Sequence, residues 1–218
     1  MKRRQNKTGV TLVEILVVVA IIAILVTMVI GIAARVDTQG KERLTKNTIA
    51  ILDAALGEFG DYGYSYTEYP NYAGLKFPPD CNNFLQSDLE TALGGTISGG
   101  THDAKYSGSE VMYFFLSRVP ESRKTLDKID KKLVTNLGLD GNPMKITINP
   151  GVDEKIYPLF RVIDPWGETL RYSYYKNIRE SSPSSEPDPD SPRTFPVITS
   201  AGPDGDFNTV GDNITNRD

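Results

Sequence analysis

Residues 10–34 read VTLVEILVVVAIIAILVTMVIGIAA, an apolar stretch with Glu14 as its one charged residue. Its longer part, Ile15 to Ala34, contains no charged residue. A helix of about 20 apolar residues is long enough to cross the hydrocarbon core of a bilayer, which is about 30 Å thick. The stretch therefore predicts a helix that spans a membrane.

The charges around this stretch predict its orientation. The basic residues on its N-terminal side are Lys2, Arg3, Arg4 and Lys7, and no acidic residue accompanies them. Positive charge favours the cytoplasmic side, so we expect the N-terminus inside the cell and the chain after Arg35 outside. A secretory signal peptide has a shorter apolar region, of about 7–15 residues. Neither signal-peptide removal nor a plain uncleaved anchor accounts for Glu14.

Glu14 lies within the apolar run, where a carboxylate is unfavourable. An acidic side chain at the centre of a membrane helix costs about 2.5–3.5 kcal/mol, and less near the membrane edge. A carboxylate at such an unfavourable position is usually paired with a positively charged or hydrogen-bonding group. The alternative is that Glu14 lies at the level of the lipid headgroups and is solvated.

The helix is expected to continue beyond the membrane. Leu44, Thr48, Ile51 or Leu52, Ala55 and Phe59 recur every three or four residues and would share one face. A helix from Val10 to about Phe59 would be about 75 Å long at 1.5 Å per residue. Composition changes after Asp61, where the sequence DYGYSYTEYPNYAGLKFPP predicts an ordered loop whose tyrosines pack across a sheet edge.

Three helix-like pieces follow, at residues 84–93, 109–119 and 122–137. A Gly/Ser-rich interval separates the first two, and His102 lies in it, so we expect this side chain to be exposed and without a catalytic role. Four strand-like segments come next, at residues 145–149, 157–163, 169–175 and 195–199. The stretch at 181–192 reads as a proline-rich loop between two of them.

The predicted fold class is therefore α+β. A long N-terminal helix, half transmembrane and half amphipathic, packs on a small C-terminal antiparallel sheet, with a helical and loop insertion between them. The expected organisation is a basic leader at 1–9, a transmembrane and assembly helix at 10–36, its amphipathic continuation at 37–60, the insertion at 61–144, and the sheet with an acidic loop at 145–218.

Composition argues against several function classes. The net charge is −4, and without the leader's basic residues 20 basic residues stand against 28 acidic ones, which gives −8. Nucleic-acid affinity depends on Lys and Arg, so no nucleic-acid partner is expected. Cys81 and His102 are the only residues of their kinds, which excludes intrachain disulfides and Cys/His zinc sites. We expect Cys81 to be buried. Because no GxSxG, HExxH or phosphate-binding glycine loop appears, no enzymatic activity is predicted.

The run KTGVTLVEILVV, Lys7 to Val18, closely resembles the processing site of type IV prepilins and type II secretion pseudopilins. The resemblance implies that a membrane prepilin peptidase cuts between Gly9 and Val10 and methylates the new N-terminus. Val10 stands where Phe is more usual. Thr11 and Glu14 are implied in assembly, with Glu14 of one subunit pairing with the new amine of a neighbour. Two buried charges are tolerable together, whereas one left unpaired costs about 3–5 kcal/mol.

Two C-terminal segments resemble the major pseudopilins. Asp164, Pro165, Trp166 and Gly167 form a DPWG motif, for which a structural role is expected: Pro165 and Gly167 shape a turn and Trp166 packs over the core. The tail at 200–216, SAGPDGDFNTVGDNITN, is similar to their calcium loop. It concentrates oxygen donors suited to Ca²⁺, namely Asp204, Asp206, Asn208, Asp212 and Asn213. The alternative is a flexible C-terminus.

The leading hypothesis is a structural subunit of a pseudopilus in a type II secretion-like system. The resemblance implies self-association into a filament, with minor pseudopilins, prepilin peptidase and an inner-membrane assembly platform as partners. It implies a single-pass inner-membrane protein with a periplasmic C-terminal domain before assembly. One alternative is a type IV pilus subunit, in a surface filament for adhesion, motility or DNA uptake. Another is a membrane-anchored enzyme or binding protein.

Overall fold

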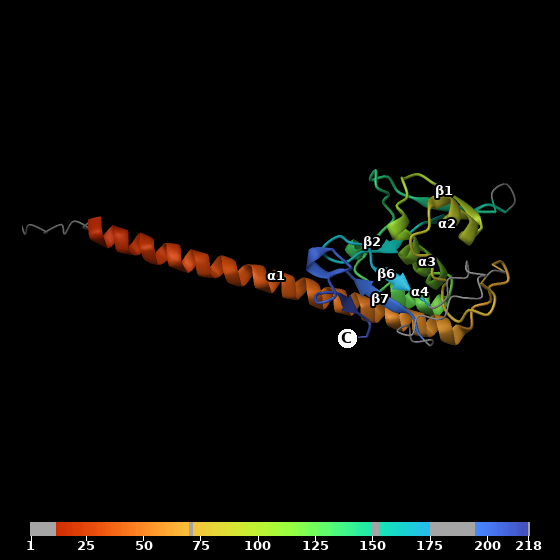
Figure 1. Cartoon of the computed structure of the whole chain (residues 1–218), viewed down its shortest axis with the longest axis horizontal. Helices are drawn as coiled ribbons and strands as arrows, with labels where there is room; N and C mark the ends of the chain where they lie inside the picture. The colour runs from red at the N-terminus through yellow and green to blue at the C-terminus, as the bar shows by residue number, and fades with distance from the viewer. Residues whose placement is uncertain (1–11, 70–71, 150–152, 175–194, 218) are drawn as a thin grey trace, which may run out of the picture. The chain divides into compact units, whose positions relative to one another are not determined.

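The computed structural model describes residues 12–69, 72–149, 153–174 and 195–217, except for the side chains of residues 28–35. The predicted leader at 1–9 and the proline-rich loop at 181–192 lie outside these residues. The chain divides into two compact units, residues 1–40 and 41–218. Figure 1 colours the elements in chain order.

Helices and strands alternate irregularly along the chain. The helices are α1 (Leu12–Tyr62), α2 (Gln86–Leu93), α3 (Ser107–Leu116) and α4 (Pro120–Leu126). Short 3-10 turns occur at η2 (Ala104–Tyr106), η3 (Lys131–Leu133) and η4 (Gly202–Asp204). The strands are β1 (Gly95–Ser98), β2 (Val134–Thr135), β3 (Lys145–Ile148), β4 (Lys155–Pro158), β5 (Arg161–Val162), β6 (Arg171–Ser173), β7 (Val197–Ser200) and β8 (Ile214–Thr215). This confirms the predicted α+β class.

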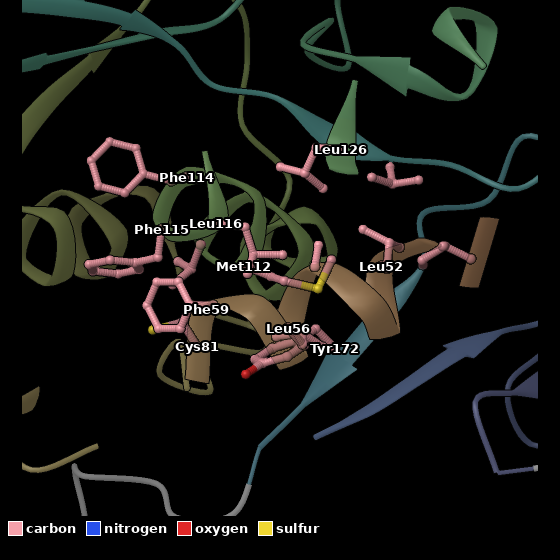
Figure 2. Packing of buried hydrophobic residues seen from close by; sticks show 14 of the residues in the cluster. Leu52, Leu56, Phe59, Cys81, Met112, Phe114, Phe115, Leu116, Leu126 and Tyr172 are labelled. Carbon is pink, nitrogen blue, oxygen red and sulfur yellow. The ribbon is translucent and has the colours of Figure 1, made fainter. Parts of the chain in front are cut away.

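The C-terminal part of α1 supplies one wall of the core. Leu52, Leu56 and Phe59 are fully buried, and Thr48 and Ala55 are buried beside them on the same face. Figure 2 shows Leu56 and Phe59 turned toward Met112 and Leu116 of α3, with Tyr172 of β6 beneath Leu56. The predicted amphipathic face is confirmed, because residues three and four apart on a helix lie on one side.

The strands form three small antiparallel sheets where a single one was expected. Their strand orders are β1-β3-β4, β2-β5 and β6-β7-β8. In the first sheet Ile97 pairs with Ile146, and both are buried. In the third, Tyr172 pairs with Ile198, and both are fully buried. The first and third sheets therefore each contribute buried side chains to the common core.

Two sequence predictions of local structure were wrong. Strand β1 occupies part of the Gly/Ser-rich interval, for which no strand was predicted, and Gly95 pairs there with Ile148. A Cβ on Gly95 would lie 2.6 Å from the carbonyl oxygen of Thr147, so the close approach of the two backbones requires glycine. The third helix-like piece forms only α4, because the chain then passes through η3 into β2.

The tyrosine-rich loop after α1 packs into the core. Tyr66, Tyr69 and Tyr72 are buried around Phe115 of α3, with ring centroids 5.4, 5.2 and 6.3 Å from it. Edge-on contacts of this kind are the preferred geometry of aromatic pairs. The loop therefore packs on a helix, whereas the sequence predicted a sheet edge. Cys81 is buried, as expected.

Candidate functional site

The N-terminal part of α1 presents an apolar surface. Every residue from 12 to 27 is exposed in the single subunit. Leu12 is 80% exposed and Ile24 is 64% exposed, although both side chains are fully apolar. Glu14 lies in the first turn of the helix, and it is the acidic residue of that turn. An apolar helical surface of this kind requires lipid or another apolar surface to cover it.

Asp164 of the DPWG segment is the centre of a buried hydrogen-bond network. Its Oδ1 accepts from the backbone N–H groups of Trp166 and Glu168, each at 3.0 Å. Its Oδ2 accepts from the Ser200 hydroxyl at 2.7 Å, and Ser200 Oγ in turn accepts from the Gly202 N–H at 3.1 Å. Burial raises the pKa of Asp164, and the hydrogen bond from Ser200 opposes that rise. The carboxyl group thus joins the DPWG turn to β7 and η4.

The other DPWG residues adopt turn geometry. Gly167 has φ of 100°, a conformation that favours glycine. Trp166 is half-buried and packs against the core cluster. The sequence interpretation gave a structural role to the whole DPWG motif, but it assigned no specific contact to Asp164. An aspartate before a turn often accepts the backbone N–H group two residues further along the chain. The position of Asp164 before Pro165 and Gly167 could therefore have indicated this hydrogen bond from the sequence.

The predicted calcium donors fall into two sets. The first set, Asp204, Asp206 and Asn208, is exposed, and the Asp204 and Asp206 carboxylates accept the backbone N–H groups of Asp206 and Asn208, each at 2.9 Å. The second set is partly buried: Oδ1 of Asp212 and Oδ1 of Asn213 are inaccessible and lack a hydrogen-bond partner within the described chain. Within those residues, no three His, Cys, Asp or Glu side chains are grouped as a metal site would need. Two orphaned oxygens are compatible with a cation.

Gly202 allows two parts of the C-terminal tail to pack closely together. Gly202 has φ of 72°, and a Cβ there would lie 2.3 Å from the backbone oxygen of Asp212. Only glycine permits this contact between η4 and the loop before β8.

The prediction that the His102 side chain is exposed was wrong. It is 1% exposed, and its Nε2 lies 3.0 Å from Oε2 of Glu110, a fully buried carboxylate of α3. Burial raises the pKa of Glu110, while the hydrogen bond and charge of His102 oppose the rise. Sequence reasoning missed this pair. The signal was Glu110 itself, an acidic residue at the start of the apolar run VMYFFL.

The comparisons with known proteins bear on the N-terminus. Residues 4–30 match the family model described as the prokaryotic N-terminal methylation motif. The chain carries this methylation motif. The match is consistent with the type IV pilin-like and pseudopilin family. Comparison with the curated proteins and with the solved structures gives no match.

The methylation motif includes the residues predicted for processing and assembly. Gly9, Val10 and Thr11 lie outside the described residues, whereas Glu14 lies in the first turn of α1. The motif suggests anchoring in the inner membrane. Among the residues that the structure describes, no helix has an apolar stretch long enough for a membrane span. Part of the predicted span over 15–34 lies outside the described side chains, which omit 28–35.

Proposed function

We propose that this protein is a structural subunit of a pseudopilus in a type II secretion-like system. Prepilin peptidase cleaves it after Gly9 and methylates Val10, and the subunit then joins the filament through its N-terminal helix. The observation that carries the proposal is the coincidence of the methylation motif with an apolar helix surface that the single subunit leaves exposed. Lipid covers this surface before assembly, and the helices of other subunits cover it afterwards.

The subunit is held in the inner membrane with its N-terminus in the cytoplasm and its C-terminal domain in the periplasm. The basic residues before the apolar stretch support this orientation. Its partners are further copies of itself, minor pseudopilins, prepilin peptidase and an inner-membrane assembly platform. The DPWG sequence and the acidic tail support the pseudopilin assignment over a general pilin.

The tail is proposed to bind Ca²⁺. Asp212 and Asn213 supply oxygens that lack partners within the described chain, and calcium binds oxygen donors in flexible geometries. Bound calcium would hold the loop before β8 against η4 and stabilise the subunit. Asp204, Asp206 and Asn208 belong to the same tail and remain candidate donors.

The second candidate function is a type IV pilus subunit in a surface filament, which the methylation motif favours equally. Immunogold electron microscopy of intact cells at native expression separates the two. Label confined to the periplasm, seen only after sectioning, supports the pseudopilus. Label along fibres that leave the cell surface would contradict it and support the surface pilus.

A further inference from the structure

A cavity of about 1020 Å³ lies in the unit formed by residues 41–218. Its walls come from the loop after α1, from α3, from α4 and from the region of β4. Six of the sixteen described lining residues are aromatic, namely Tyr62, Tyr64, Tyr113, Phe114, Tyr157 and Phe160. Cavities that bind small molecules are typically lined in this way, with a few polar groups that orient the ligand.

Two arginines line the cavity: Arg123 is exposed, whereas Arg118 lies among the aromatic rings. Its guanidinium carbon lies 4.0 Å from the ring centroid of Phe114, 5.1 Å from that of Tyr157 and 6.0 Å from that of Tyr69. Its Nε and Nη2 are buried and have no hydrogen-bond partner in the described part of the chain. Ring faces attract a cation but do not accept the in-plane N–H bonds of a guanidinium. Arg118 therefore has two buried donors that are unsatisfied.

Arg161 shows how the same fold satisfies a stacked guanidinium. It lies 3.5 Å from the ring centroid of Tyr106, and it also donates from Nε to Thr169 at 3.2 Å and from Nη1 to the Leu137 carbonyl at 2.8 Å. Arg118 has the ring contacts and a side-chain hydrogen bond with Tyr64, but its Nε and Nη2 lack an acceptor in the described chain. Buried hydrogen-bond donors usually have an acceptor. The unsatisfied Nε and Nη2 of Arg118 therefore indicate that an acceptor from outside the chain can bind there.

The orphaned atoms define the chemistry of that acceptor. Nε and Nη2 form one edge of the guanidinium, which can bind both oxygens of a carboxylate through two parallel hydrogen bonds. The acidic residues that line the cavity are Glu68 and Asp127, and both are exposed. Neither forms an ion pair with Arg118 in the described structure.

We propose that this cavity binds a small organic acid, whose carboxylate pairs with Arg118 and whose ring packs against the tyrosines. Tyr157 borders both the guanidinium and the cavity. Because Nε and Nη2 are buried, the proposed binding requires a bordering side chain such as Tyr157 to move when the ligand enters. The site goes beyond the proposed filament function and does not depend on it. It gives the folded unit a means of responding to a small molecule.

The test uses the processed full-length chain in a non-ionic polyoxyethylene detergent. Isothermal titration with 4-hydroxyphenylacetate and glucuronate measures binding of an aromatic and a sugar carboxylate, and inorganic phosphate tests for a simple anion. We expect saturable binding of at least one of the two carboxylates. No saturable binding of either, or phosphate binding of equal strength, would overturn the proposal.

Variants locate the site. Arg118→Lys keeps the positive charge but removes the two parallel donors of the guanidinium. Binding should weaken about tenfold, which is the effect expected from the loss of one charged hydrogen bond. Tyr62→Ala alters the rim at a side chain that is 60% exposed, so it should fold normally and weaken binding. Lys124→Gln is the control, because Lys124 is exposed and pairs with Glu121. Equal binding by Arg118→Lys and Lys124→Gln would contradict the assignment.

Chemical-shift mapping on the wild type keeps the proposal testable if the Arg118 variant does not fold. The ligand should shift the backbone amide signals of Tyr64, Tyr113 and Tyr157 most strongly. Shifts centred elsewhere on the unit would overturn the proposed site.

Discussion

At the scale of single residues, the buried pair of Glu110 and His102 is the main ionisable feature of the core. Glu110 Oε2 contacts His102, while its Oε1 is buried without a hydrogen-bond partner in the described chain. Arg161 and His102 favour the charged carboxylate, and Asp103 opposes it, but burial outweighs them and raises the pKa of Glu110. The folded state therefore holds the Glu110 proton more tightly than the unfolded state does.

This pair predicts a pH dependence of stability. An unfolded glutamate has a pKa of about 4.3. Between that value and the raised pKa of Glu110, the folded chain binds more protons than the unfolded chain, so the free energy of unfolding falls as the pH rises through this window. We expect Glu110→Gln to reduce this fall. Urea unfolding of the processed chain in detergent, followed by Trp166 fluorescence from pH 4 upward, measures it.

The matched control is Glu121→Gln, because Glu121 is an exposed partner of Lys124 on α4. It should leave the pH profile as in the wild type. Asp80 and Asp164 also have raised pKa values, so a residual slope should remain in Glu110→Gln. An unchanged slope in that variant would show that Glu110 does not titrate as described.

Glu14 carries the second prediction at this scale. Its alanine variant should insert into the membrane normally, because removing a carboxylate from an apolar helix does not hinder insertion. Filament assembly should fall sharply, since in the proposed pairing the amine on Val10 of a neighbouring subunit would lose its partner, at a cost of about 3–5 kcal/mol. Quantitative blotting of sheared filaments against the membrane fraction measures both. Glu42→Ala on the same helix is the control, and a normal filament yield from Glu14→Ala would remove Glu14 from the mechanism.

At the scale of elements, α1 could be predicted because its periodicity is local. The spacing of Leu52, Ala55 and Phe59 requires only the helical repeat, and the structure buries all three. Strand β1 could not be predicted in the same way. Its residues are glycine- and serine-rich, and it forms because β3 pairs with it from far along the chain. The His102 and Glu110 contact was likewise hidden, because it depends on how the loop before η2 packs against α3.

The packing of α1 predicts the effect of a core truncation. Leu56 is fully buried against α3 and β6, so Leu56→Ala should lower the free energy of unfolding by about 2–5 kcal/mol through lost contacts and a residual cavity. Leu139→Ala is the control, because that side chain is 59% exposed and its removal should change stability by less than about 0.5 kcal/mol. Equal effects on urea unfolding in the two variants would contradict the described core.

The acidic tail carries the calcium prediction. If Asp212 contributes to a cation site, calcium at about a hundred times its dissociation constant should stabilise the unit by about 2.7 kcal/mol. The thermal midpoint in calcium should then exceed that in chelator. Asp212→Asn should lose most of this difference, while Asp127→Asn, at the exposed residue that follows α4, should keep it. A midpoint that does not respond to calcium in the wild type would rule out the site.

At the scale of the whole molecule, the chain combines a folded unit with a helix whose N-terminal part exposes an apolar surface. Residues 41–218 bury a continuous core, whereas the described side chains from 12 to 27 are exposed and mostly apolar. The sequence could predict this division, because a long apolar run and a basic leader are visible without tertiary information. It could not predict the aromatic cavity around Arg118, whose walls come from four separate segments.

The proposed filament function depends on processing of the N-terminus, which intact-mass spectrometry measures. Chain purified from cells with active prepilin peptidase should begin at Val10 and carry one methyl group on its amine. Gly9→Leu should keep Met1, because a bulky residue blocks the cut. A wild-type chain that still begins at Met1 in those cells would contradict the proposed processing.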